Sequence, residues 1–190
     1  MRVKDEVKQK ALFEATIKVV NQIGFAASSI SKIAGEAGIS PATIYIYHEN
    51  KEELLVSTYV EIKRGLGEAL LRDFDESRPI RDTFKQVWTN GFAYVAKNRA
   101  AFDFAEQFAN SPYSELVNTA EVDKYFEPLM LTFQRGVQQK IIKDISFDLM
   151  SAFLFYPLMY LSNRRHCSGF ELTDENIDLA FDMAWDAIKL

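Results

Sequence analysis

The sequence predicts an all-α fold. Apolar residues recur at helical spacing along most of the 190-residue chain, and no convincing alternating strand of five or more residues appears. Helix-capping residues mark the breaks between the helical segments. Apolar residues make up 48 % and charged residues 26 % of the chain, a composition typical of a globular protein.

Two short helices joined by a glycine turn form the most informative stretch, residues 29–51. The first is predicted over residues 30–37, with Ser29 as its N-cap and Gly38 in the left-handed conformation at its end. Ser40 is the predicted cap of the second helix, and Pro41 lies in its first turn. Such a pair is the helix-turn-helix unit, whose second helix enters the DNA major groove.

The remaining helices follow from apolar faces and turn signals. A helix over residues 3–23, ended by Gly24, is predicted to turn Ala11, Leu12, Ala15, Val19 and Ile23 inward. Asn50 and Glu53 resemble a capping box that opens a helix over residues 51–74. Further helices are predicted over residues 80–98 and 99–109, to residue 140 from an undefined start, over 147–165 with a bend at Pro157, and over 174–189.

Charge is unevenly distributed along the chain. The whole chain carries a net charge of −5, but residues 1–51 hold seven Lys/Arg and five Asp/Glu, a net +2. The acidic excess therefore belongs to residues 52–190, which need not touch DNA. No apolar run reaches about 18 residues, so we expect no membrane span. The charged start predicts no signal peptide, and the one cysteine, Cys167, suits a reducing cytoplasm.

Residues 11–55 carry a dense series of motifs in a consistent order. They are Ala11-x-x-x-Ala15, Gly24-Phe25, Ser28-Ser29-Ile30, Ile33-Ala34, Ala37-Gly38-Ile39-Ser40, Thr43-Ile44-Tyr45, Tyr47 and Lys51-Glu52-Glu53-Leu54-Leu55. By these motifs the sequence resembles the N-terminal domain of the TetR family of bacterial transcriptional regulators. Two positions depart from the family pattern: His48 stands where Phe is usual, and Ile46 occupies a variable, often polar position.

The resemblance implies a three-helix helix-turn-helix DNA-binding domain over residues 1–51. Residues 52–190 would form a helical domain for effector binding and dimerisation. A homodimer would bind a palindromic double-stranded DNA operator as a repressor, and a small molecule would release it. No enzyme activity, metal or other cofactor is implied.

The recognition helix and its flanks supply the predicted DNA contacts. Tyrosine and threonine hydroxyls suit phosphate oxygens and several base edges, and a lysine ammonium beside a helix N-terminus suits a phosphate. Ile46 would meet a thymine methyl, whereas Tyr45 is alternatively a core residue. The predicted contacts, several of them carried over from the resemblance, are Ser29, Ser40, Pro41, Ala42, Thr43, Tyr45, Ile46, Tyr47 and Lys51.

Four polar or aromatic residues on otherwise apolar faces are the predicted effector site. Tyr59 and Lys63 lie one turn apart on the linking helix, and Asp148 shares a face with Phe155. A buried carboxylate beside aromatic rings would favour a small aromatic or cationic molecule. The alternative is an ordinary aromatic core, with Asp148 a solvated residue stabilised by the helix dipole.

The last helix carries the predicted dimer contacts. Phe181, Trp185 and Ile188 belong to an apolar stripe, and family members dimerise through their last two helices as a four-helix bundle. A row of aspartates four residues apart is expected to face solvent or a basic partner, with Arg164 and Arg165 as candidates. This row comprises Asp174, Asp178, Asp182 and Asp186.

Two alternative functions use the same scaffold. Cys167, beside His166 and the two arginines, would make a thiol-based redox sensor if its pKa were lowered. The other alternative is a helical ligand-binding protein without DNA binding. Catalysis has little support, since there is no metal-ligand spacing, phosphate loop or nucleophile elbow.

Overall fold

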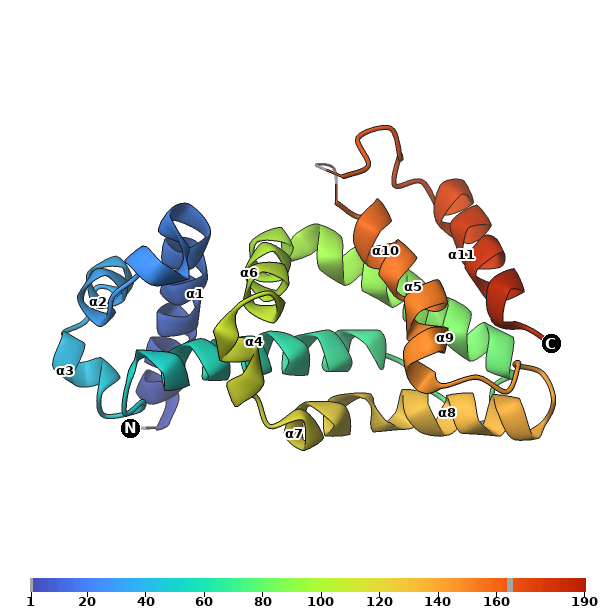
Figure 1. The fold of residues 1–190 in the computed structure, drawn as a ribbon, viewed down its shortest axis with the longest axis horizontal. Coiled ribbons are helices and arrows are strands. Elements are labelled where there is room, and N and C mark those ends of the chain that lie inside the picture. The colour runs from blue at the N-terminus through green and yellow to red at the C-terminus, as the bar shows by residue number, and fades with distance from the viewer. Residues whose placement is uncertain (1, 164–165) are drawn as a thin grey trace. The chain divides into compact units, whose positions relative to one another are not determined.

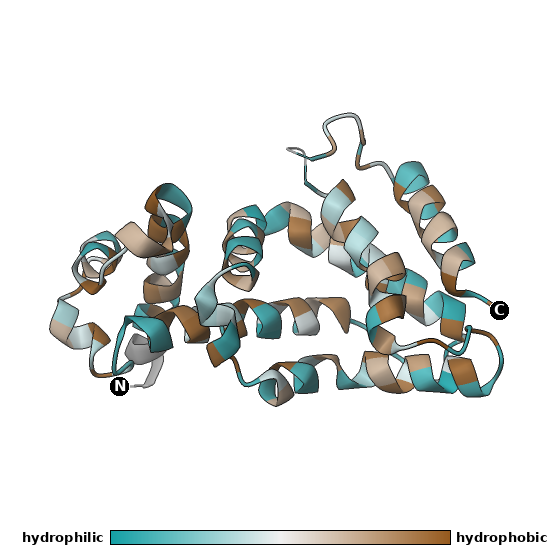
Figure 2. Cartoon of the chain, in the orientation of Figure 1, coloured by the Kyte–Doolittle hydropathy of each residue, from teal (hydrophilic) through white to brown (hydrophobic). Residues whose placement is uncertain are grey.

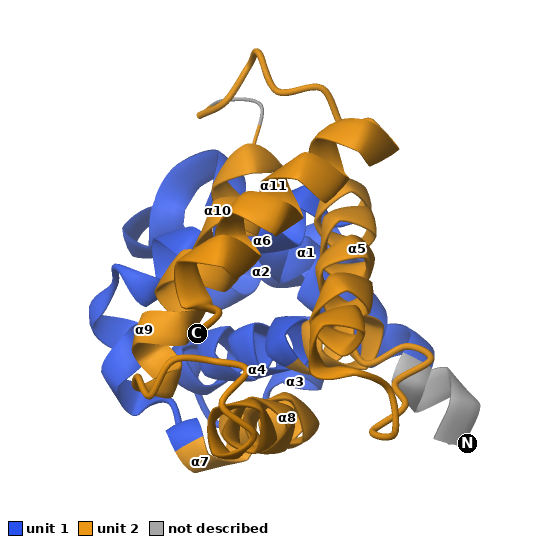
Figure 3. Ribbon diagram, turned by 90° about the vertical axis from the view of Figure 1, so that its right-hand side faces the viewer, with its two compact units in different colours: residues 1–63, 98–119 blue, residues 64–97, 120–190 orange. Residues whose placement is uncertain are grey.

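The computed structural model describes residues 2–163 and 166–190, and this part of the chain is helical, with no β-strand (Figure 1). The chain forms two compact units (Figure 3). Unit 1 comprises Met1–Lys63 and Asn98–Thr119, and unit 2 comprises Arg64–Lys97 and Ala120–Leu190. Most helices carry both apolar and polar residues, as an amphipathic pattern requires (Figure 2).

Unit 1 is built around the N-terminal helices. Gly24 breaks helix α1 with φ 75° and ψ 167°, as predicted from its sequence. Ile23, predicted to point inward, is exposed, because the helical face ends where the chain departs at Gly24. The helices of unit 1 are α1 (Arg2–Ala27), α2 (Ile30–Ala37), α3 (Pro41–Ile44), the first part of α4 (Lys51–Leu70), α6 (Arg99–Ala109) and the 3₁₀ helix η1 (Pro112–Leu116).

Residues 98–119 pack with the N-terminal helices, so the units do not follow the predicted boundary after residue 51. Val20 and Leu55 share a buried cluster with Phe104 and Phe108 of α6. Phe25 adds edge contacts to this cluster, with ring centroids 5.5 Å from Phe104 and 6.0 Å from Phe108. The two separate stretches therefore form one hydrophobic core.

Unit 2 contains the C-terminal helices. Its long predicted helix over 147–165 is two helices in the structure, since Pro157 cannot donate a backbone hydrogen bond and the chain is interrupted at Phe155. The predicted helix that ends near residue 140 is likewise divided. The helices are α5 (Ile80–Lys97), α7 (Thr119–Asp123) at the border, η2 (Lys124–Phe126), α8 (Glu127–Gln138), α9 (Phe147–Leu154), α10 (Tyr156–Leu161) and α11 (Asp174–Ile188).

The apolar stripe of α11 is part of the core of unit 2. Phe181, Trp185 and Ile188 are buried within their own chain. The Phe181 ring lies 5.8 Å from that of Trp88, and the Trp185 ring lies 6.1 Å from that of Phe84. Helix α5 covers Phe181 and Trp185, and Ile188 is also buried, so the structure lends no support to these three residues as the dimer contact.

The aspartate row of α11 finds basic partners on α5. Asp182 pairs with Arg81 at 2.6 Å, and Asp178 pairs with Lys85 at 2.8 Å. These ion pairs offset the repulsion expected among like charges spaced one turn apart. Arg164 and Arg165, the predicted partners of the row, lie outside the described residues.

Candidate nucleic-acid interface

Local capping contacts shape the helix-turn-helix as predicted. The Ser29 hydroxyl accepts a hydrogen bond from the N–H of Lys32 at 3.3 Å, and Gly38 ends α2 in the left-handed conformation with φ 66°. The Ser40 hydroxyl accepts from the N–H of Thr43 at 3.2 Å and lies 2.9 Å from its Oγ1. Each helix start is thus closed by a side chain that accepts from the N–H three positions further on.

Helix α3 divides its residues between the core and the surface. Ile44 is fully buried, in a cluster with residues such as Leu12, Ile33 and Leu54. The next two residues point out of the unit: Tyr45 is 56 % exposed and Ile46 is 75 % exposed. Tyr45 is thus a surface residue, not the core residue of the alternative interpretation.

The chain continues past α3 as hydrogen-bonded turns. The N–H of Ile46 donates to the carbonyl of Thr43 at 3.3 Å, and that of Tyr47 donates to the carbonyl of Ile44 at 2.9 Å. We call residues 45–48 the recognition turn. Pro41 and Ala42 are exposed beside it, while the side chains of Thr43 and Tyr47 are half-buried. The predicted contact residues of this segment are therefore all exposed or half-buried.

Lys51 is held by the protein itself. Its Nζ donates to the backbone carbonyls of Phe25 and Ser28, at 2.8 and 3.0 Å, and lies 6.0 Å from the centre of the Tyr113 ring. An ammonium carries three N–H donors, so one remains for a phosphate. The sequence suggested the phosphate contact but not the bridge from α4 to the end of α1.

The start of α4 is closed by the predicted capping box. The N–H of Glu53 donates to the Asn50 side chain at 2.8 Å, and the Glu53 carboxylate accepts from the N–H of Glu49 at 2.5 Å. The reciprocal bond thus falls one residue earlier than in the standard motif. This arrangement positions Lys51 at the first turn of α4.

The predicted effector residues divide between the two units. In unit 1, Tyr59 stacks on Phe108 with ring centroids 4.5 Å apart, and the Nζ of Lys63 lies 5.3 Å from the Tyr59 ring centre. In unit 2, Phe155 packs against a cluster that includes Leu70. The Tyr59–Lys63 pair therefore forms as its one-turn spacing predicts.

Asp148 does not fit the predicted effector site. Its side chain is exposed in the first turn of α9, where the helix dipole favours a carboxylate. The expectation of a buried carboxylate is therefore wrong. A small cavity in unit 2, lined by residues that include Leu70, Phe74 and Val87, has a volume of about 10 Å³, room for about one water molecule.

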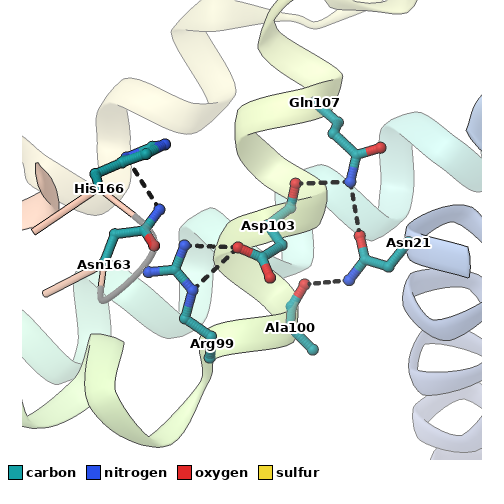
Figure 4. Close-up of polar contacts among 7 residues, drawn as sticks. All are labelled: Asn21, Arg99, Ala100, Asp103, Gln107, Asn163 and His166. Carbon is teal, nitrogen blue, oxygen red and sulfur yellow. Dashed lines mark hydrogen bonds and ion pairs between the residues drawn. The ribbon is translucent and has the colours of Figure 1, made fainter. Parts of the chain in front are cut away.

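A polar network that the sequence did not suggest joins α6 to α1 within unit 1 (Figure 4). The Asn21 amide donates to the carbonyl of Ala100 at 2.8 Å and accepts from the Gln107 amide at 3.0 Å. Arg99 pairs with Asp103 one turn along α6 at 2.6 Å. Asn21 lies about 80 residues before its partners on α6, so helical periodicity alone does not reveal this network.

The segment around Cys167 is held by contacts within unit 2. The Cys167 thiol is half-buried, and its backbone N–H donates to the carbonyl of Asn163 at 2.8 Å. The His166 ring lies 3.1 Å from the Asn163 amide and stacks on Tyr160 (Figure 4). Neither contact involves the sulfur, so the structure adds no support for a redox site.

The described residues contain neither a candidate membrane-spanning helix nor a candidate metal site. Within residues 2–163 and 166–190, no helix combines the length and apolarity needed to cross a bilayer. In the same residues, no group of three or more His, Cys, Asp or Glu side chains has the arrangement of a metal site.

A three-helix head with two helices meeting at a left-handed glycine, beside an exposed recognition turn, defines a helix-turn-helix DNA-binding protein. Residues 12–58 match the family of bacterial regulatory proteins, tetR family, and residues 79–189 match the tetracyclin repressor-like C-terminal domain. The chain belongs to the TetR family of transcriptional regulators, and it is a DNA-binding regulator. The resemblance seen in the sequence is thereby confirmed.

Similar proteins agree with this assignment. A TetR family transcription regulator from Marinobacter aquaeolei VT8 has a crystal structure with a TM-score of 0.89 and 35 % identity, covering 100 % of this chain and 99 % of that one. An HTH-type transcriptional regulator of Haemophilus influenzae is 24 % identical over 180 residues, 94 % of each chain. A fatty acid metabolism regulator of Bacillus subtilis is 30 % identical over 89 residues, which are 47 % of this chain and 46 % of that protein.

Proposed function

We propose that the protein is a ligand-released repressor that acts in the cytoplasm as a homodimer on a near-palindromic DNA operator. The observation that carries the proposal is the exposed pair Tyr45 and Ile46 at the recognition turn. Large apolar side chains left uncovered at the end of a helix-turn-helix suit contact with base edges and thymine methyl groups. The family's regulators are not enzymes, and neither of the two alternative functions is favoured.

The proposed DNA surface keeps all the predicted contact residues. Tyr45, Ile46 and Tyr47 would face the major groove. The serine and threonine hydroxyls and the third N–H of Lys51 would face phosphates. The set is Ser29, Ser40, Pro41, Ala42, Thr43, Tyr45, Ile46, Tyr47 and Lys51.

An exposed apolar face of unit 2 supports the proposed homodimer. Helices α9 and α11 pack against each other. Phe153 of α9 is 52 % exposed and Met183 of α11 is 69 % exposed, with Leu149, Tyr156 and Leu179 also exposed. Exposed apolar patches of this kind are typical of protein–protein interfaces. We therefore replace the buried residues of α11 with this face as the proposed dimer contact.

A small aromatic effector is supported by the stacked Tyr59 ring and the neighbouring Lys63 ammonium. Lys63 would favour an acceptor or an anionic group on that molecule. The exposure of Asp148 removes the reason for a cationic effector. Ligand binding releases the operator only if the released conformation binds the molecule more tightly than the DNA-bound one.

The test of DNA recognition begins by selecting a preferred duplex from random sequences with the full-length protein. Ile46→Ala and Tyr45→Ala are expected to weaken binding to this duplex about 5- to 150-fold, by the 1–3 kcal/mol typical of a base contact. Binding to random DNA should change much less. Leu131→Ala, an exposed apolar residue of α8, is the matched control. Unchanged discrimination in both head variants would contradict the proposed surface.

A further inference from the structure

His48 closes the recognition turn and anchors it in unit 1. Its backbone N–H donates to the carbonyl of Ile44 at 3.0 Å. Its side chain is only 7 % exposed, and the ring lies 6.2 Å from that of Phe13 on α1, tilted by 58°. The His48 ring therefore packs the end of the recognition turn against α1.

The buried ring has an unusual polar environment. Neither Nδ1 nor Nε2 of His48 has a hydrogen-bond partner. Within the described residues, these two atoms make up the set of buried side-chain nitrogen and oxygen atoms without a partner. A neutral imidazole leaves one N–H donor unpaired, whereas the protonated ring would leave two donors and a charge. Burial without partners penalises the charged form far more than the neutral form.

The groups around the ring do not neutralise this penalty. Glu53 of α4 is the carboxylate that acts on His48, but it accepts the backbone N–H of Glu49 at 2.5 Å. On α1 the ring meets Phe13, whose charged neighbours in sequence, Lys10 and Glu14, are exposed and lie 4.0 Å from each other. The titratable side chains of the recognition turn besides His48 are the phenols of Tyr45, which is exposed, and Tyr47, which is half-buried.

We infer that His48 is an acid-sensitive positioning residue for DNA recognition: its neutral ring seats the recognition turn, and its protonation releases the turn. This inference goes beyond the proposed repressor function, although its effect on DNA rests on the proposed recognition surface. A phenylalanine ring at this position would seat the turn without responding to pH.

The direction of the pH effect follows from proton linkage. Desolvation by burial lowers the pKa of His48, and the Glu53 charge opposes this in part. A released ring titrates near 6.5, so below that pH the released state binds more protons than the seated state. The neutral His48 ring therefore contributes its full stabilisation of the seated turn above about pH 6.5, and this stabilisation is lost as the pH falls below that value. At pH 5.5 the equilibrium shifts toward the released turn by up to about tenfold.

Amide hydrogen exchange of the full-length protein without DNA tests the seating directly. The probes are the amides of Ile46, Tyr47 and His48, all hydrogen-bonded within the turn. After correction for the chemical exchange rate, their protection in the wild type should fall by up to about tenfold from pH 7.5 to pH 5.5. In His48→Phe this fall should disappear. His166→Gln, which changes the other histidine of the chain, should retain it.

Each outcome decides the inference. Equal pH dependence in the wild type and His48→Phe would overturn it, as would its loss in His166→Gln. If His48→Phe does not fold, His48→Leu is measured in its place. A second measurement determines the affinity for a selected duplex at pH 7.5 and at pH 5.5 and takes the ratio of the first to the second. This ratio is expected to be larger in the wild type than in the His48 variant. If the ratios are equal while amide exchange still depends on pH, only the link between His48 and DNA binding is overturned.

Discussion

Two pairs of large apolar residues have opposite environments in this protein. Tyr45 and Ile46 stand in the recognition turn and are exposed, whereas Phe181 and Trp185 stand on α11 and are buried. Helix α3 has only four residues and reaches the core through Ile44. Helix α11 has fifteen residues and lies against α5, which supplies aromatic partners. Residue type therefore does not decide burial here; the presence of a covering partner within the chain does.

The largest expected effect sharpens this comparison through stability. Phe181→Ala should lower the free energy of unfolding by about 3–5 kcal/mol, because it removes a fully buried ring and leaves a cavity. Ile46→Ala, the matched change at an exposed apolar residue, should alter it by less than about 0.5 kcal/mol. Urea unfolding of both variants measures the difference, and similar losses in the two would contradict the assignment of core and surface.

Assembly provides the next test, at the exposed apolar face of unit 2. Phe153→Asp should raise the dimer dissociation constant by at least about thirtyfold, since truncating an interface hot spot costs 2 kcal/mol or more. Sedimentation across a concentration series measures this constant. Leu131→Asp changes an exposed apolar residue on α8 and should leave it unaltered. A dimer that is equally stable in both variants would place the interface elsewhere.

Lys51 tests whether one residue serves both the fold and the DNA. Lys51→Ala removes the hydrogen bonds to Phe25 and Ser28 and should destabilise the protein by about 1–3 kcal/mol. It should also weaken operator and random DNA alike and reduce the salt slope by about one per monomer.

The two effects of this substitution are separable. Lys32→Ala is the comparison, because Lys32 donates to the carbonyl of Ala27 at 2.9 Å from the same region. If Lys51→Ala lowers stability while the salt slope stays constant, the lysine acts only within the protein. If the slope falls without a loss of stability, its internal hydrogen bonds contribute little.

The smallest effect is expected at the aspartate row of α11. Arg81 pairs with Asp182, and its guanidinium also lies 5.4 Å from the Phe181 ring centre. A double-mutant cycle with Arg81→Met and Asp182→Asn should give a coupling energy below about 1 kcal/mol, because the pair is largely exposed and screened by salt. A coupling of several kcal/mol would show that the ion pair, rather than the apolar stripe, holds α11 on α5.

Some features of these regions were predicted from the sequence and others were not. The helix-turn-helix and its motifs were predicted from sequence, as were the caps at Ser29 and Ser40. For Asp148 the sequence left a buried and a solvated carboxylate open, and for the 147–165 helix it predicted a bend at Pro157 rather than a break at Phe155. Asp148 stayed open because a first-turn carboxylate can lie on an apolar face and still reach water. The break was misplaced because the position of a proline does not define how far the helix is interrupted around it.

By itself the sequence determined the local structure of this protein: caps, the left-handed Gly38 turn and apolar faces involve residues no more than a few turns apart. The tertiary structure decided which apolar faces are covered. The rings of Trp88 and Phe181 meet across more than ninety residues, and α6 joins the N-terminal helices across about eighty. Burial also gave His48 its partnerless environment. Such outcomes depend on long-range packing, which the spacing of residues along one helix does not encode.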